Sequence, residues 1–170
     1  MRILSKNIRF RIAADGGSAS GKTTGGRIIA KHFGMKFLSS GALYRYCALK
    51  LIENKKKINK NFIKKICNSI NLKKLNSKAL YDPNVAKLSS KIAKIAFVRQ
   101  SLKEFQNKFI INSKLVVIEG RDIGSKIMPD ADLKLFFKCS SKEKAKRRFK
   151  KFKFLNKKIT LKEVQKALIQ

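Results

Sequence analysis

The fold is decided near the N-terminus by the stretch Gly16-Gly17-Ser18-Ala19-Ser20-Gly21-Lys22-Thr23. It fits the pattern G-x-x-x-x-G-K-[ST], in which glycine-rich backbone amides surround a phosphate group. The apolar run Ile12-Ala13-Ala14 precedes it, and apolar residues at helical spacing follow it as far as Phe33. A strand, a glycine loop and a helix form the context that a phosphate-binding loop needs, because the helix start adds free N–H donors. We expect Lys22 to reach the terminal phosphates of a nucleoside triphosphate and the Thr23 hydroxyl to bind magnesium.

The composition limits the classes of protein to which the chain can belong. Its 170 residues, 44% of them hydrophobic, suit one domain with a small insert and a real core. No run approaches the ~20 apolar residues that a membrane span needs, so we expect no membrane association. The first expected strand begins near Arg9, which leaves no room for a signal or transit peptide. Cys47, Cys67 and Cys139 are far apart and lack metal spacing, which favours reduced thiols in a cytoplasmic protein.

The net charge of +32 raises the question of a nucleic-acid partner. Lysine supplies most of this charge and is scattered along the chain, which indicates a biased composition rather than a binding groove. We therefore expect only weak, salt-sensitive binding to polyanions and no specific nucleic-acid partner. Against this background each arginine is a candidate for a bidentate phosphate contact, above all Arg45, Arg99 and Arg121, although any of them could form a surface ion pair.

Strands and helices alternate along the chain, which predicts a parallel α/β sheet with ligands at the carboxyl ends of its strands. The expected strands are 9–14, 36–38, 115–118 and 133–137, and the last two are continuous apolar runs typical of strands buried on both faces. The expected helices are 23–33, 42–53, an amphipathic helix within 55–77, 85–95 after a break at Pro83, 97–112, 140–154, and a last one capped by Thr160 and Glu163.

Further motifs follow the phosphate loop in a fixed order. They are Ser40-Gly41-Ala42-Leu43-Tyr44-Arg45, Ser89-Ser90, Phe97-Val98-Arg99, Glu119-Gly120-Arg121-Asp122-Ile123-Gly124-Ser125, Pro129-Asp130-Ala131-Asp132-Leu133-Lys134-Leu135-Phe136 and Ala145-Lys146-Arg147-Arg148. The series resembles the bacterial cytidylate (CMP/dCMP) kinase family over nearly the whole chain, most specifically over 12–45 and 85–148. The resemblance implies a P-loop nucleoside-monophosphate-kinase-like fold of three layers, with a parallel sheet flanked by helices. It implies a core of 1–45 and 110–170, with a partial lid at about 147–160, and a helical insert, 46–100, that binds the monophosphate.

The same resemblance implies a reaction, in which the γ-phosphate of ATP passes to CMP or dCMP in the presence of Mg²⁺. By motif position the ATP-binding residues are Gly16, Gly17, Ser18, Ala19, Ser20, Gly21, Lys22, Thr23 and Thr24, and the CMP-binding residues are Ser40, Arg45, Ser90, Arg99, Arg121 and Asp122. Lys22 and Arg121 are the expected catalytic residues, and Thr23 is the expected magnesium ligand. Glu119 either acts on magnesium through water or is a solvated carboxylate at a strand end. The expected partners are these small substrates alone, and we expect a monomer.

The chain departs from the family pattern at three places. Ser39 stands where the family usually has Asp, and Leu80-Tyr81 stands where it has Ile-Arg. We also expect the R-D-x-x-D-x-x-R lid, the fifth strand and the terminal helix of the family to be missing after Gln170, so that the fold is C-terminally truncated and 133–137 becomes an exposed apolar edge. Lid arginines stabilise the phosphoryl group in transfer. Two alternatives therefore stay open: a catalytically inactive ATP- and CMP-binding fragment, or a basic nucleic-acid-binding P-loop protein.

Overall fold

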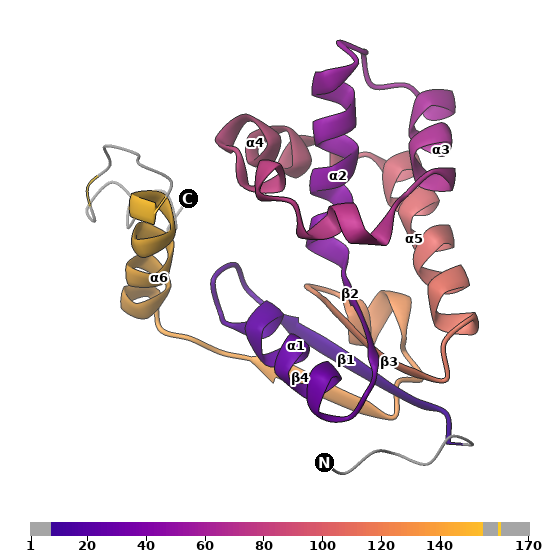
Figure 1. The fold of residues 1–170 in the computed structure, drawn as a ribbon, viewed down its shortest axis with the longest axis vertical. Helices are drawn as coiled ribbons and strands as arrows, with labels where there is room; N and C mark the ends of the chain where they lie inside the picture. The colour runs from indigo at the N-terminus through magenta and orange to yellow at the C-terminus, as the bar shows by residue number, and fades with distance from the viewer. Residues whose placement is uncertain (1–7, 155–159, 161–170) are drawn as a thin grey trace.

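A four-stranded parallel sheet forms the centre of the computed structural model, which describes residues 8–154 and 160 (Figure 1). The strands are β1 (Phe10–Gly16), β2 (Lys36–Ser39), β3 (Leu115–Gly120) and β4 (Leu133–Phe137). They lie in the order β2-β3-β1-β4, and every neighbouring pair is parallel. The predicted α/β fold with a parallel sheet is confirmed. Because the strands are parallel, the segments that follow them meet along one edge of the sheet.

The helices agree with the expected ones to within a few residues at most ends. They are α1 (Lys22–His32), α2 (Ser40–Glu53), α3 (Lys60–Asn68), α4 (Pro83–Ile92), α5 (Ala96–Ile111) and α6 (Ser141–Phe154), with the 3₁₀ turns η1 (Leu72–Asn76) and η2 (Lys78–Tyr81) and the π turn η3 (Ile123–Ile127). The amphipathic segment within 55–77 divides into α3 and η1. Pro83 does not break the chain before α4 but begins it, because proline suits the first helical position and the Asp82 carboxylate accepts a 2.7 Å hydrogen bond from the Asn84 N–H.

Side chains from alternate residues of each strand point to opposite faces of the sheet and create two cores. Ile12, Ala14 and Val117 pack with Ala30 of α1 on one face. The other face belongs to a larger core, in which Ala13, Leu38, Val116 and Ile118 pack with buried residues of α2, α3, α4 and α5. The result is the expected three-layer arrangement, with α1 on one side of the sheet and the larger group of helices on the other (Figure 1).

The two apolar runs that we expected to be buried on both faces differ in burial: β3 is buried, whereas β4 is partly exposed. Val116, Val117 and Ile118 are fully buried, because β3 pairs with β1 on one side and β2 on the other. The expectation was wrong for β4, where Leu133 is 41% exposed and Phe136 is 65% exposed. Within the part of the chain that the structure describes, β4 pairs with β1 alone. Its expected role as an exposed apolar edge is confirmed there.

The last described helix, α6, follows β4 and lies apart from the group formed by α2, α3, α4 and α5 (Figure 1). The Ser140 hydroxyl caps its start by accepting a 3.2 Å hydrogen bond from the Glu143 N–H, as the sequence indicated. The further helix expected from Thr160 and Glu163 lies outside the described residues. Among the described helices, none is long and apolar enough to cross a membrane.

Gly120, at the end of β3, provides a test of this packing. A methyl group added there would lie 2.7 Å from two side-chain carbons of Ile123, which is fully buried and would have to shift within the core. Gly120→Ala should therefore lower the free energy of unfolding by about 1–3 kcal/mol, as overpacked cores do. Gly41→Ala is the matched control, because the nearest atom to its methyl group would be the Ser39 hydroxyl at 4.0 Å. Denaturant unfolding measures both, and a Gly120→Ala protein as stable as the parent would contradict the packing described.

Candidate functional site

A cleft of about 1470 Å³ lies where β1, β2 and β3 end. The phosphate loop follows β1, Ser39 and Ser40 stand where β2 passes into α2, and Glu119 and Gly120 end β3. Ligands of parallel α/β sheets bind at this edge, where the loops after several strands converge. The position of the cleft therefore follows from the direction of the strands.

The cleft brings together almost all of the residues that we expected to bind ligands. Those that line it are Ser18, Ala19, Ser20, Gly21, Lys22, Thr23, Thr24, Ser40, Arg45, Ser90, Arg99, Glu119, Arg121 and Asp122. Gly16 and Gly17 are the exceptions. Gly16 is buried at the end of β1, where an added Cβ would lie only 2.6 Å from the Phe137 carbonyl oxygen. Gly17 contributes its carbonyl oxygen, which accepts a hydrogen bond from Lys22.

The backbone of the phosphate loop leaves donors available for an anion. Gly21 precedes α1 in the left-handed region, at φ +95°, and no side chain caps the first turn of that helix. The first N–H groups of a helix have no partner within the helix, and they attract negative charge. The Ser20 hydroxyl is buried, and no partner for it exists among the described residues. A buried hydroxyl without a partner in native proteins calls for an explanation, and a ligand oxygen supplies one.

A buried carboxylate forms the floor of the donor side of the cleft. Glu119 is only 3% exposed. One of its oxygens, Oε1, accepts hydrogen bonds from the hydroxyls of Thr23, at 3.1 Å, and Ser39. The other, Oε2, lies 3.8 Å from the Lys22 ammonium, which also donates a 2.9 Å hydrogen bond to the Gly17 carbonyl. Glu119 is therefore not the solvated strand-end carboxylate that the sequence left open.

Positive charge is concentrated around Lys22. Burial lowers the pKa of the Lys22 ammonium from its usual value, and the nearby Arg121 and Arg45 guanidinium groups lower it further. Glu119 is the strongest influence in the opposite direction. Three cations held near one another in a half-buried cleft create a field that favours a polyanionic ligand such as a nucleotide phosphate.

The acceptor side of the cleft contains an ion pair between α5 and the loop after β3. The Arg99 guanidinium donates a 2.8 Å hydrogen bond to the Asp122 carboxylate, and this contact raises the pKa of Arg99. Arg45, on α2, lies over the ring of Tyr81 at 5.3 Å from guanidinium carbon to ring centroid. Tyr81 belongs to the Leu80-Tyr81 pair, which stands where the family pattern has Ile-Arg. Its ring provides a cation–π contact that orients Arg45.

Two basic residues of α6, Lys144 and Arg147, reach the phosphate loop. The resemblance places Arg147 at the start of the partial lid but assigns neither residue to a ligand. An added Cβ on Gly21 would lie 3.0 Å from Nη1 of Arg147, and one on Gly17 would lie 3.5 Å from Nζ of Lys144. Arg147 also lines the cleft and pairs with Glu143 at 3.2 Å. The available signal was the spacing of Lys144 and Arg147, which places them on one face of a helix.

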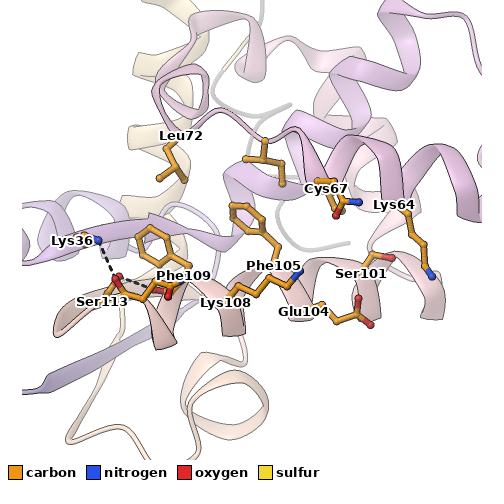
Figure 2. A pocket seen from close by; sticks show the side chains of 13 residues that line it. Lys36, Lys64, Cys67, Leu72, Ser101, Glu104, Phe105, Lys108, Phe109 and Ser113 are labelled. Carbon is orange, nitrogen blue, oxygen red and sulfur yellow. Dashed lines mark hydrogen bonds between the residues drawn. The ribbon is translucent and has the colours of Figure 1, made fainter.

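A second cavity, of about 590 Å³, lies between α3, α5 and the start of β2 (Figure 2). Phe105 and Phe109 point into it, and none of the expected site residues lines it. The Ser113 hydroxyl and the Lys36 ammonium at its edge already donate hydrogen bonds to backbone carbonyls, at 2.6 and 3.2 Å. The cleft at the strand ends, with its unpaired donors and clustered cations, is therefore the candidate site.

Comparison with known proteins points to one family. A family profile described as cytidylate kinase matches residues 12–170. The chain is 37% identical over 166 residues to a cytidylate kinase of Pseudothermotoga lettingae, covering 92% of this chain and 74% of that protein. It is 38% identical over 169 residues to that of Thermosipho africanus, covering 94% and 75%. It is 35% identical over 160 residues to that of Rickettsia rickettsii, covering 94% and 73%.

The electrostatic arrangement around Lys22 leads to a test. Glu119→Gln should lower the pKa of Lys22 further, because it removes the main group that raises it and leaves the burial and the two arginines. Reductive ¹³C-methylation followed by NMR titration measures this pKa, and a Lys22→Arg protein identifies the resonance. Glu104→Gln, an exposed substitution on α5, is the control and should leave the titration unchanged. An unchanged Lys22 pKa in Glu119→Gln would contradict the assignment of this ion pair.

Proposed function

The chain belongs to the cytidylate kinase family of ATP-dependent phosphotransferases, and we propose that it transfers the γ-phosphate of ATP to CMP or dCMP, giving CDP or dCDP. One observation carries the proposal: a single cleft joins a phosphate loop to Ser40, Arg45, Ser90, Arg99, Arg121 and Asp122. A kinase for a nucleoside monophosphate needs two nucleotide sites that face each other, and this cleft contains donors for both.

The donor half of the site holds the phosphates of ATP. The backbone amides of the loop and the free N–H groups at the start of α1 surround them. The Ser20 hydroxyl, which has no partner among the described residues, gains one there. Lys22 leaves the Gly17 carbonyl and Glu119 and turns toward the phosphates. Its lowered pKa reflects the cost of the buried charge, which a phosphate oxygen offsets.

We propose Mg²⁺ as the cofactor, which the Thr23 hydroxyl would bind and on which Glu119 would act through water. The residues present suit it, because the Thr23 hydroxyl and the Glu119 carboxylate are hard oxygen donors on the wall of the cleft. Within the described part of the chain no cluster of three or more His, Cys, Asp or Glu exists that could enclose a metal. Mg²⁺ usually takes one or two protein oxygens, with substrate phosphates and water as its other ligands. When bound, it neutralises charge on the phosphate oxygens.

The acceptor half of the site positions CMP. The guanidinium groups of Arg45 and Arg121 form forked hydrogen bonds to its dianionic phosphate. The Arg99–Asp122 pair holds the carboxylate of Asp122 in place for the hydroxyls of the sugar, and Ser90 and Arg99 face the cytosine. We also propose that residues 46–100 form the insert that carries the acceptor, since Ser90 lies within it and Arg99 lies near its end.

Phosphoryl transfer needs alignment and positive charge more than covalent chemistry. Lys22 and Arg121 line the same cleft and supply charge on both sides of the phosphoryl group. Electrostatic groups that are already in place, rather than recruited at the moment of reaction, provide the largest share of catalysis in many enzymes. No residue has to act as a general base in this scheme, because the attacking phosphate oxygen of CMP is already ionised.

A coupled assay of ADP release with CMP, dCMP, UMP and AMP tests the proposed reaction. We expect turnover with CMP and dCMP to exceed that with UMP and AMP. Equal rates with all four acceptors would refute the cytidine assignment. Binding of ATP and CMP in calorimetry without turnover would instead support an inactive nucleotide-binding protein. Duplex DNA binding that persists at about 0.5 M salt would support a nucleic-acid-binding protein, because counterion-driven affinity collapses there.

Arg147 provides a second test within the proposed site. Its guanidinium lies beside the phosphate loop, so Arg147→Ala should raise the KM for ATP about 10-fold, the effect of one lost hydrogen bond to a charged group. The KM for CMP should change much less. Lys142→Ala removes a charge from the same helix at an exposed position outside the cleft and is the matched control. Equal effects of the two substitutions would mean that Arg147 contributes only general charge.

A further inference from the structure

Ser39 occupies an unusual position at the junction of β2 and α2. It is the last residue of β2 and the N-cap of α2, and it is 8% exposed. Its hydroxyl oxygen accepts a 3.2 Å hydrogen bond from the Ala42 N–H, and its hydroxyl proton is donated to Glu119 Oε1. This one group therefore connects the first turn of α2 to the buried carboxylate at the end of β3.

In the proposed function, the surroundings of Glu119 change when ATP binds, which is why the carboxylate needs such support. Its Oε2 faces the Lys22 ammonium at 3.8 Å, and its Oε1 accepts the two hydroxyl protons. If Lys22 turns toward a phosphate, as the proposed function requires, Glu119 loses the cation nearest to it. A buried carboxylate without hydrogen bonds is costly, so the hydroxyls of Thr23 and Ser39 then become its remaining protein partners in this network.

The hydroxyls of Thr23 and Ser39 differ in what they can still do. Thr23 donates its proton to Glu119, which leaves its oxygen lone pairs free on the wall of the cleft. The Ser39 oxygen already accepts the Ala42 N–H, and its proton is engaged by Glu119. Both residues line the cleft, but the Ser39 hydroxyl makes two hydrogen bonds within the protein and the Thr23 hydroxyl makes one, so Thr23 has the greater capacity left for a ligand.

We propose that Ser39 is a positioning residue that holds Glu119 aimed at Thr23 while Lys22 is engaged with the phosphates of ATP. Through the cap of α2, it also ties this carboxylate to the helix that presents Ser40 and Arg45 to the acceptor. Ser39, which stands where the family usually has Asp, thus acts on the donor site through a neutral hydroxyl. The inference rests on the proposed function.

Two substitutions at position 39 test the role, and two controls separate it from helix capping. Ser39→Ala removes the hydroxyl and the cap. Ser39→Gly removes the hydroxyl but retains an acceptable N-cap residue, so it serves if the alanine protein is unstable. Ser39→Thr keeps a hydroxyl at this position and should therefore preserve the effect of Mg²⁺ on ATP binding. Asn59→Ala removes a cap of the same kind from α3, far from Glu119, where Asn59 accepts a 2.8 Å hydrogen bond from the Phe62 N–H.

The measurement is the affinity for ATP with Mg²⁺ and with EDTA, by calorimetry in the absence of CMP. We expect the gain in affinity that Mg²⁺ gives to fall about 10-fold in Ser39→Ala and Ser39→Gly, the size expected for one hydrogen bond to a charged group. In Ser39→Thr and Asn59→Ala, this gain in affinity should stay within about two-fold of that of the parent. In kinetic assays, Ser39→Ala and Ser39→Gly should raise the KM for ATP more than the KM for CMP.

An unchanged Mg²⁺ effect in Ser39→Ala and Ser39→Gly, or an equal loss in Asn59→Ala, would overturn the inference. The outcome is distinguishable from failure of the proposed function. If the protein phosphorylates CMP and the Ser39 substitutions leave the Mg²⁺ effect unchanged, then the proposed function stands and the role of Ser39 is wrong. If the protein does not phosphorylate CMP, but the Ser39 substitutions weaken its Mg²⁺-dependent binding of ATP, then the role of Ser39 stands and the proposed acceptor is wrong.

Discussion

The site depends on one buried carboxylate, that of Glu119. It is placed at the end of β3, between two other strands, and hydrogen bonds converge on it from α1 and from the end of β2. A carboxylate that is almost excluded from water has to satisfy its oxygens from the protein. The hydrogen bonds that it needs come from Thr23 in α1 and from Ser39 at the end of β2, which are far apart along the chain. The carboxylate therefore aligns the phosphate loop with α2. The geometry of the donor side is thus a consequence of burying a charge at the centre of a parallel sheet.

Much of the fold could be predicted, because many of its elements are determined by residues close together in the sequence. The phosphate loop, the apolar core of β3 and the starts of α1 and α5 depend on nearby residues. The prediction that β4 is buried on both faces was wrong, because an apolar run such as Leu133–Phe137 indicates hydrophobicity but not how many strands lie beside it. In the site, motifs identified the residues that line the cleft. The proximity of Arg147 to Gly21 and the bonds of Ser39 could not be predicted, since both join segments separated by many residues in sequence.

The few acidic residues contrast with the many basic ones. The chain has 10 Asp and Glu against 42 Lys and Arg, yet three of the acids hold the loop ends around the cleft. Asp15 accepts 2.8 Å hydrogen bonds from the N–H groups of Ile123 and Gly124, Glu119 binds two hydroxyls, and Asp122 binds Arg99. Lysines scattered over the surface set the overall charge, whereas the scarce carboxylates fix specific geometry. Net charge is therefore a poor guide to the function of this molecule.

The exposed edge of β4 also affects how copies of the protein behave toward one another. Among the residues that the structure describes, no strand pairs with the outer side of β4, and Phe136 is 65% exposed, a combination that favours strand pairing between molecules. A net charge of +32 opposes such encounters by repulsion over the Debye length, which is ~10 Å at 0.1 M salt and ~3 Å at 1 M. Colloidal stability is thus supplied by composition rather than by the shape of the edge, and the ionic strength of the medium decides how closely two of these edges can approach.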